Sequence, residues 1–258
     1  TIIVTGASRG LGAATARIAA RMETNVVLTA RSEQGLKTVA QQIEEAGGRA
    51  FIVVGDLTQA ADCQHIVAEA IRAFSQVDGV VNNAAVLTPI APIAAADPDA
   101  WSANLTVNVL GPFMLTQAAL PYLRRSNGRV VNVSTGAAVS VVPSWSAYCV
   151  SKAALNHLTR ALAEEEPTIT TIAVRPGVVD TDMQAIIRRQ GANGMPPEVY
   201  ARFVNYHEEG DLLPPEVPGC ALAVLALHAP KEWSGTCLSW DNEEVQSLVR
   251  RYACSPGT

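Results

Sequence analysis

The chain has 258 residues, of which 48% are hydrophobic, with a net charge of −5 and an isoelectric point near 5.4. A chain of this length and apolar content can bury a large core within a single α/β domain. Because it has no basic cluster beyond short arginine pairs, its acidic balance argues against nucleic-acid and acidic-membrane partners, and a small molecule is expected instead.

The cysteines predict neither a disulfide framework nor a metal site, because their number is odd and no C-x-x-C or histidine-rich spacing occurs. We expect reduced, structural thiols at Cys63, Cys149, Cys220, Cys237 and Cys254. The longest apolar runs are far too short to cross a bilayer, and no charged leader precedes the first predicted strand. A soluble, cytoplasmic protein is therefore expected.

Apolar, β-branched runs alternate with helical patterns along the chain. Strands are predicted over residues 1–5, 25–30, 50–54, 78–82, 129–134, 169–174 and 234–239. Helices are predicted over about 11–22, 33–46, 59–76, 98–125, 144–165 and 216–228. This alternation is typical of βαβ units, whose right-handed crossovers build a doubly wound parallel sheet with helices on both faces. We predict a single-domain Rossmann-type α/β fold over residues 1–258 with about seven strands, its cofactor half spanning 1–135.

A glycine-rich turn follows the first predicted strand and has the spacing G-x-x-x-G-x-G. Gly6 can turn where a side chain would clash, Gly10 lets backbone approach a pyrophosphate, and Gly12 permits close helix packing. The free N–H groups of the following helix would face the phosphates. A purely structural turn is the alternative for a glycine loop that stands alone.

The second predicted strand ends on Ala30, where an NAD-binding chain has an acidic residue for the ribose 2′-hydroxyl. Here Arg31 and Ser32 follow instead. Arg31, with Arg9 and Ser8 from the glycine turn, could bind a 2′-phosphate through charge-assisted hydrogen bonds. An exposed loop arginine is the alternative.

Polar residues farther along the chain also have structural explanations. Asp56 could be the N-cap of a helix that begins near Thr58. Asn108 lies inside a predicted helix, where asparagine is unfavourable, and the following Gly111-Pro112 favours a local bend.

The segment after the sixth predicted strand begins with a turn at Pro176-Gly177, and Thr181 could cap a helix there. Residues 183–213 are then irregular and rich in Gly, Pro and apolar side chains. We interpret this segment as a lid over a substrate, with ordinary core packing as the alternative.

Tyr148 and Lys152 stand four residues apart in a predicted helix and would share one face. An ammonium beside a phenol in a dry site can lower the pKa of the phenol and make it an acid or base. Taken alone, such a pair is usually a surface pair.

Together these segments resemble the short-chain dehydrogenase/reductase family over nearly the whole chain. The residues that carry the resemblance are Thr5-Gly6-x-x-x-Gly10-x-Gly12, Asp56-Leu57, Asn82-Asn83-Ala84-Ala85, Asn108, Ser134-Thr135, Tyr148-x-x-x-Lys152, and Pro176-Gly177 with Thr181. Within the family, the tail and the Pro-Gly segment are most similar to benzil reductase and sepiapterin reductase-like members.

The resemblance implies four catalytic residues. Tyr148 would pass a proton to a carbonyl oxygen, and Lys152 would bind the nicotinamide ribose and lower the Tyr148 pKa. Asn108 would hold a water that completes a proton relay, with a structural asparagine as the alternative. Thr135 stands where the family has Ser and would steady the substrate oxygen. Ser134 points to the opposite face of the strand and ranks second as this donor.

The resemblance also implies NADP(H) as the cofactor, with Asp56 and Leu57 at the adenine and Val179 and Thr181 at the nicotinamide carboxamide. The implied cofactor-binding residues are Gly6, Ser8, Arg9, Gly10, Leu11, Gly12, Arg31, Ser32, Asp56, Leu57, Asn83, Ala84, Tyr148, Lys152, Pro176, Gly177, Val179 and Thr181. Ala85 departs from the family's Gly, which requires a negative φ or slight strain there. A homodimer or homotetramer is implied, built on the helices that carry Asn108 and Tyr148.

We therefore predict an NADPH-dependent carbonyl reductase or alcohol dehydrogenase for small hydrophobic ketones or diketones. Its predicted pocket residues are Ser134, Val142, Trp145, Met183, Ile187 and Phe203. Arg188 and Arg189 are expected to face solvent, so the pocket is expected to have no cation positioned to bind a substrate carboxylate. Asp241 is expected to be an exposed helix cap rather than a residue that binds the substrate. A non-catalytic NADP(H) sensor and a family epimerase or dehydratase are the alternatives.

Overall fold

A parallel sheet of seven strands runs through residues 1–253, the part of the chain that this computed structural model describes. The strands are β1 Ile2–Thr5, β2 Val26–Ala30, β3 Ala50–Val54, β4 Gly79–Asn82, β5 Arg129–Val133, β6 Thr170–Arg175 and β7 Cys237–Ser239. Their order across the sheet is β3-β2-β1-β4-β5-β6-β7, with parallel pairing throughout. The predicted doubly wound Rossmann-type sheet is confirmed, and only β6 extends beyond its predicted range, by one residue.

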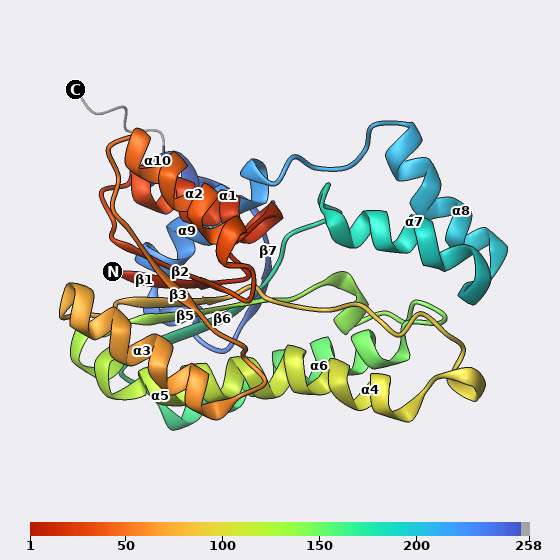
Figure 1. Ribbon diagram of the computed structural model, residues 1–258, viewed down its shortest axis with the longest axis horizontal. Helices are drawn as coiled ribbons and strands as arrows, with labels where there is room; N and C mark the ends of the chain where they lie inside the picture. Colours follow the sequence, from red (N-terminus) through yellow and green to blue (C-terminus); the bar gives the residue numbers. More distant parts are fainter. Residues whose placement is uncertain (254–258) are drawn as a thin grey trace.

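Helices cover both faces of the sheet (Figure 1). One layer contains α1 Gly10–Arg21, α2 Glu33–Glu45, α9 Glu216–His228 and α10 Glu243–Ala253. The other contains α3 Ala60–Phe74, α4 Pro98–Leu105, α5 Gly111–Ser126 and α6 Ser146–Glu165. No helix in residues 1–253 has both the length and the apolar composition that crossing a membrane requires.

Two hydrophobic cores lie on opposite faces of the sheet because successive strand residues point to opposite sides. Ile2 and Val4 belong to the core beneath α1 and α9, whereas Ile3 belongs to the core beneath α3 and α5. All three are fully buried. Each such side chain contributes about 1.5–3 kcal/mol by leaving water, which is why these apolar runs form central strands.

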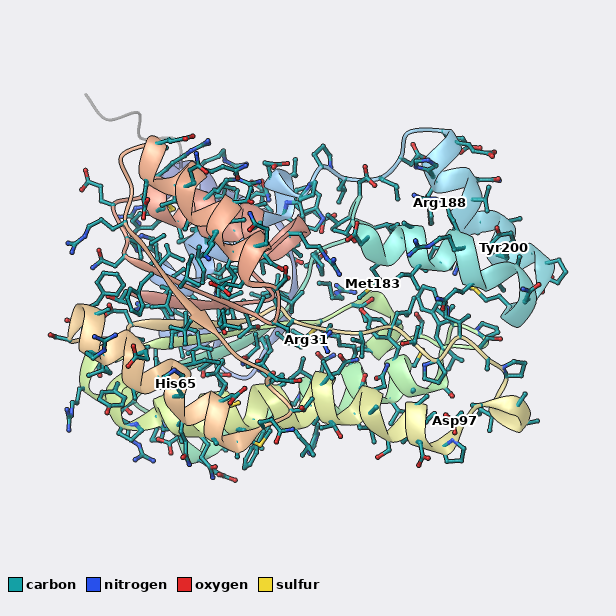
Figure 2. All side chains as sticks on the ribbon, viewed as in Figure 1. Arg31, His65, Asp97, Met183, Arg188 and Tyr200 are labelled. Carbon is teal, nitrogen blue, oxygen red and sulfur yellow. The ribbon has the colours of Figure 1, made fainter. Side chains whose placement is uncertain are left out.

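The segment predicted to be irregular contains two helices, α7 Asp182–Gly194 and α8 Pro197–Glu208. The glycines suggested irregular structure, but they lie within or at the end of a helix and allow it to pack closely against its neighbours. A Cβ on Gly191 would lie 2.8 Å from a Tyr200 ring carbon, and one on Gly194 would lie 2.3 Å from the Ile90 carbonyl oxygen. Figure 2 shows that Met183, at the start of α7, lies nearer the strand ends than Tyr200 on α8.

The C-terminal helix α10 was also missed, although its signal is present. Val245, Leu248 and Val249 are spaced i, i+3, i+4 and pack against the core beneath α1 and α9. Cys254 lies outside the described residues.

The long helix predicted over 98–125 consists of α4, a π-helical turn at Thr106–Leu110, and α5. The π-helical turn holds Asn108, and Pro112 is the second residue of α5, which continues directly from this turn. The predicted irregularity near Gly111-Pro112 is therefore present one turn earlier.

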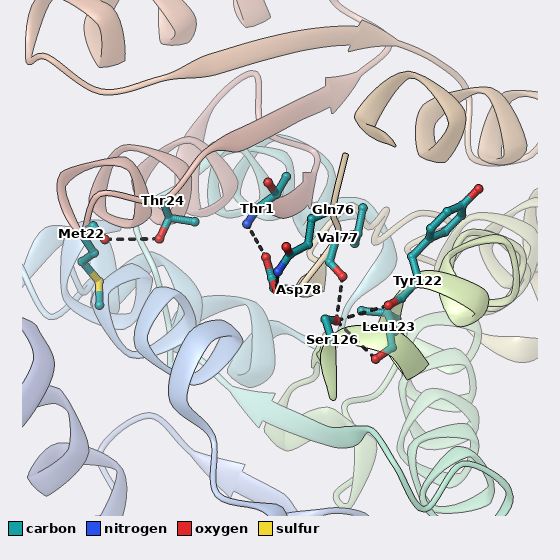
Figure 3. A network of polar contacts seen from close by, with 9 residues as sticks. All are labelled: Thr1, Met22, Thr24, Gln76, Val77, Asp78, Tyr122, Leu123 and Ser126. Atoms are coloured by element: carbon teal, nitrogen blue, oxygen red, sulfur yellow. Dashed lines mark hydrogen bonds and ion pairs between the residues drawn. The ribbon is translucent and has the colours of Figure 1, made fainter. Parts of the chain in front are cut away.

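The C-terminal end of α5 is tied to the turn before β4 (Figure 3). The Ser126 hydroxyl donates to the Val77 carbonyl at 2.9 Å and also lies near the carbonyls of Tyr122 and Leu123, both at 3.3 Å. These contacts hold the C-terminal end of α5, whose N-terminal end continues from the π-helical turn that holds Asn108.

Candidate active site

The glycine turn is shaped by contacts that only glycine permits. Gly6 and Gly10 have left-handed φ values of +63° and +54°. A Cβ on Gly12 would lie 2.5 Å from both the Gly6 carbonyl oxygen and the Asn83 Nδ2 atom. Helix α1 begins here with no side-chain cap and no acidic residue in its first turn, so its free N–H groups make a positive end suited to an anion.

The turn after β4 is fastened to the end of β1. The Thr5 hydroxyl accepts hydrogen bonds from the backbone N–H groups of Asn83 and Ala84, both at 2.9 Å. The Asn83 amide donates to the Thr5 carbonyl at 2.8 Å. Ala85 is not among the residues with positive φ, so its departure from glycine is accommodated without left-handed backbone.

Two of the predicted 2′-phosphate residues, Ser8 and Ser32, lie near the start of α2. Ser32 caps α2 by accepting from Gly35 N–H at 3.3 Å, and a Cβ on Gly35 would lie 2.8 Å from the Ser8 Cβ. Arg31 is exposed at the end of β2 (Figure 2). Arg9 instead pairs with Asp182 of α7, with 3.0 Å between Nε and Oδ2, and such an exposed pair contributes at most about 1 kcal/mol.

Asp56 is not the N-cap of α3, contrary to one expectation, because Gln59 occupies that position. The Asp56 carboxylate accepts from Thr58 N–H at 2.9 Å and orders the turn before the helix. Leu57 is buried in the core beneath α3 and α5, where Gly111 approaches it so closely that a Cβ there would lie 3.0 Å from the Leu57 Cβ.

The turn after β6 lies against the glycine turn. Gly177 has a φ of +78°, and a Cβ on it would lie 2.7 Å from Leu213. Val179 forms a β-bridge with Leu213. Thr181 precedes α7 without a capping side-chain bond, and a Cβ on Gly10 would lie 3.2 Å from its methyl group. The structure thus brings together two turns that are separated by more than half of the chain.

Tyr148 and Lys152 project from the same face of α6 toward the end of β5. The Lys152 Nζ lies 5.8 Å from the centroid of the Tyr148 ring and donates to the Val133 carbonyl at 2.6 Å. The Thr135 hydroxyl hydrogen-bonds the Tyr148 oxygen. Ser134 points away, since its hydroxyl donates to Asn156 Oδ1 at 2.6 Å. Thr135, not Ser134, therefore shares the site with Tyr148.

Burial sets the ionisation of this pair. It raises the pKa of Tyr148 well above its ordinary value, with a contribution in the same direction from Cys149, whereas the Thr135 hydrogen bond acts in the lowering direction. The expected decrease in the Tyr148 pKa is therefore not present: removing the phenolate from water outweighs the favourable contacts. Burial also lowers the pKa of Lys152, to about 8. At neutral pH the phenol is protonated and the amine is mostly charged.

Asn108 is fully buried and has several hydrogen-bond partners. Its Oδ1 accepts from Val86 N–H at 2.9 Å, and its two Nδ2 hydrogens are shared among the Val86 carbonyl at 2.8 Å, Asn104 Oδ1 at 2.9 Å and Ser151 Oγ at 3.1 Å. Ser151 in turn donates to the Tyr148 carbonyl at 2.9 Å. Asn108 therefore braces the loop after β4 against α6, as the structural alternative predicted. Asn104 and Ser151 are not among the predicted site residues, although two asparagines four residues apart in one predicted helix were a usable signal for Asn104.

Most predicted pocket residues pack around Tyr148. This aromatic cluster contains Leu87, Ala137, Val142, Trp145, Tyr148, Ile187, Met195 and Phe203, with Met183 at its margin. The Trp145 ring meets Tyr148 edge-on, with centroids 6.0 Å apart, and lies 4.8 Å from the Phe203 ring. Ser134 is the exception among the predicted residues, and Leu87 and Met195 were missed.

A family model described as short chain dehydrogenase matches residues 1–192. The chain belongs to the short-chain dehydrogenase family. Its relatives include a benzil reductase from Saccharomyces cerevisiae that forms (S)-benzoin, 34% identical over 257 residues, or 95% of this chain and 97% of the relative. The likeness to benzil reductases expected from the sequence is thus supported.

Two solved structures extend the comparison. A short chain dehydrogenase/reductase from Saccharomyces cerevisiae superposes with a TM-score of 0.91 at 38% identity, covering 96% of this chain and 98% of that one. An alcohol dehydrogenase from the archaeon Thermococcus sibiricus, complexed with 5-hydroxy-NADP, gives a TM-score of 0.78 at 27% identity, covering 92% and 94%.

In this short-chain dehydrogenase, several buried polar atoms near α6 and α7 have no hydrogen-bond partner among residues 1–253. They include Trp145 Nε1, Gln184 Oε1 and Arg188 Nη1. The expectation that Arg188 faces solvent is therefore wrong for its Nη1 atom, which is buried. Arg189 is exposed, as expected.

Asp241 is exposed, as expected, but it stands two residues before α10 and so is not the residue next to the helix. Asn242 stands there, and its side chain accepts from Ser239 N–H at 2.7 Å.

Proposed function

We propose that this chain is an NADPH-dependent carbonyl reductase for small hydrophobic ketones or diketones. In the opposite direction the same reaction is that of an alcohol dehydrogenase. The observation that carries the proposal is the protonated Tyr148 phenol, held with Thr135 at the edge of an apolar, aromatic cluster. A buried phenol with a raised pKa is a proton donor at neutral pH. It can protonate an oxygen that becomes strongly basic as the carbonyl is reduced.

A nicotinamide dinucleotide fits the residues present. The uncapped start of α1 and the cradle at Gly6, Gly10 and Gly12 suit a pyrophosphate, because added Cβ atoms would fill this space. The Lys152 ammonium would hold the nicotinamide ribose, and the backbone near Val179 would hold the carboxamide. When bound, the cofactor supplies the hydride.

The protein side of the reaction assigns one task to each residue. Thr135 donates a hydrogen bond to the substrate oxygen and positions it beside Tyr148. Tyr148 then transfers its phenolic proton to that oxygen, and Lys152 stabilises the phenolate that remains. A positioned acid contributes about 10²–10⁴-fold in rate. Asn108 acts by holding α6 against the loop after β4, and we also assign it the water that returns a proton to Lys152.

The preference for NADPH over NADH is proposed from the end of β2. Arg31 is exposed there, and none of the residues at positions 30–32 is acidic. Ser8 of the glycine turn lies close to the start of α2. A carboxylate at this place would repel a 2′-phosphate, whereas a guanidinium binds it.

The substrate is proposed to be uncharged and apolar because the side chains around Tyr148 are aromatic or aliphatic. Helices α7 and α8 supply Ile187 and Phe203 to that cluster, which supports a lid over the substrate. The benzil reductase relative acts on an aromatic diketone. Desolvating a carboxylate here would be costly without a paired cation.

NADPH oxidation should be followed with benzil, aryl ketones, quinones, 2-keto acids and open-chain sugars, beside the same substrates with NADH. The expected result is the highest kcat/KM for an aryl diketone with NADPH. Tyr148→Phe keeps the ring packing but lacks the proton, so turnover should fall by about 10²-fold or more while cofactor still binds. Cofactor binding without turnover of any carbonyl would favour a sensor instead. Keto acids or open-chain sugars outpacing aryl diketones would show that the lid is polar rather than apolar.

A further inference from the structure

Trp145 carries a hydrogen-bond donor that the protein leaves unused. It precedes α6 by one residue, is 6% exposed, and its Nε1–H has no acceptor among residues 1–253. Indole N–H groups usually find a partner when they are buried. The ring contacts Tyr148 and Phe203, so the unused donor belongs to the cluster that surrounds the proposed acid.

The buried neighbours of Trp145 offer its N–H no acceptor. Apart from Tyr148, the other buried members of the aromatic cluster have no side-chain oxygen or nitrogen: Leu87, Ala137, Val142, Ile187, Met195 and Phe203. Trp101 provides a contrast on the outer side of the same region, since its Nε1 donates to Ser146 Oγ at 3.2 Å. The N–H of Trp145 is therefore left available to an acceptor on a ligand.

We propose that Trp145 Nε1–H donates to the second carbonyl oxygen of a 1,2-diketone whose first carbonyl oxygen accepts the Tyr148 proton. Trp145 is then a specificity-determining residue that selects vicinal diketones over monoketones, an inference that rests on the proposed function. The two carbonyl carbons of a 1,2-diketone are bonded to each other, so its two oxygens can accept from donors on two neighbouring rings such as those of Trp145 and Tyr148. A neutral N–H suits a neutral oxygen and does not compensate the desolvation of a carboxylate.

The test compares benzil with deoxybenzoin, which keeps both phenyl rings and replaces one carbonyl by a methylene. Trp145→Phe keeps an aromatic ring and removes the N–H. Because benzil is intrinsically more reactive, the informative quantity is each substrate's kcat/KM in the variant relative to the unmodified protein. For benzil we expect a loss of about tenfold, the effect of one hydrogen bond in a dry site, and for deoxybenzoin a loss of less than about threefold.

Trp101→Phe is the matched control, because it deletes an indole N–H that already has a protein partner. It should change both substrates equally. Equal losses on benzil and deoxybenzoin in Trp145→Phe, or no loss on either, would overturn the assignment to Trp145. Reduction of neither substrate by the unmodified protein would instead contradict the proposed function.

A second measurement uses the unmodified protein and remains available if Trp145→Phe does not fold. With saturating NADP⁺ present, the thermal midpoint is measured against increasing benzil or deoxybenzoin. Benzil should bind about tenfold more tightly. Binding of deoxybenzoin at least as tight as that of benzil would refute the role of the second carbonyl.

Discussion

Burial acts in opposite directions on the two ionisable residues of α6. Moving a phenol out of water favours its neutral form and raises its pKa, and moving an amine out of water favours its neutral form and lowers its pKa. Tyr148 and Lys152 show both effects within one helical turn. The acid is thereby kept protonated, while the amine is set near the pH at which cells work.

Lys152 should leave a pH signature on stability. Its pKa is about 8 in the folded chain and near 10.5 when unfolded, so between these values the unfolded chain binds more protons. The unfolding free energy relative to Lys152→Met should therefore rise by up to about 1.4 kcal/mol per unit from pH 8 to pH 10, and stay flat below pH 7. Urea denaturation of both proteins at each pH measures this difference. A difference independent of pH would mean that Lys152 keeps an ordinary pKa.

Thr135 and Ser134 should separate chemistry from stability. Thr135→Val keeps the shape but deletes the hydroxyl beside Tyr148, so kcat should fall by about 10-fold to 10³-fold, whereas Thr135→Ser should be tolerated. Ser134→Ala removes the bond to Asn156 and should lower stability by about 1 kcal/mol with little change in kcat. Single-turnover kinetics and thermal unfolding distinguish the two effects, and a reversed pattern would assign the substrate oxygen to Ser134.

Arg31 should govern the choice between cofactors. Arg31→Asp replaces a cation by a carboxylate at the end of β2, so NADPH binding should weaken by about 2–5 kcal/mol while NADH is unchanged or improved. Titrating both cofactors into both proteins gives the four dissociation constants. Equal affinity of the unmodified protein for NADPH and NADH would exclude a 2′-phosphate site at Arg31.

At the scale of elements, α7 depends on glycines that let it approach distant backbone. Gly194, in its last turn, is the closest case, because an added Cβ would lie 2.3 Å from the Ile90 carbonyl oxygen. Backbone cannot yield as a flexible side chain does, so even a methyl group must displace either the end of α7 or the loop that holds Ile90.

Gly194→Ala should therefore destabilise the chain by about 1–3 kcal/mol, despite the better helix propensity of alanine, and raise KM for the ketone. Asn193→Ala changes an exposed neighbour in the same turn and serves as the control. Calorimetry and steady-state kinetics on the two variants measure the effect. Equal thermal midpoints would show that the contact with Ile90 is adjustable.

At the scale of the whole molecule, the layer of α4, α5 and α6 carries an exposed apolar surface. Leu110 and Phe113 are 49% and 42% exposed, and Val150 of α6 is 46% exposed. The π-helical turn that holds Leu110 packs against α6. We propose that this surface joins copies of the chain into the expected homodimer or homotetramer, since apolar side chains at an interface leave water on association.

Phe113→Glu should accordingly reduce the molar mass measured by light scattering after gel filtration, because a carboxylate would be buried without a partner. Val54→Glu, at the other end of the sheet on β3, replaces a side chain that is 45% exposed and should leave the mass unchanged. A monomeric unmodified protein, or an unchanged mass for Phe113→Glu, would contradict an interface at this surface.

The sequence by itself determined the strands, most helices, the glycine turn and the Tyr148–Lys152 pair, because these depend on periodicity and spacing within a short stretch of chain. Tertiary structure alone decided the features that depend on packing between distant segments. In the sequence, Gly191 and Gly194 indicate a break in a helix. In the structure they belong to α7 and allow its close contacts with Tyr200 and Ile90. The sign of the Tyr148 pKa shift and the unused N–H of Trp145 follow from burial, and burial is set by the helices that fold over a residue rather than by its neighbours in the chain.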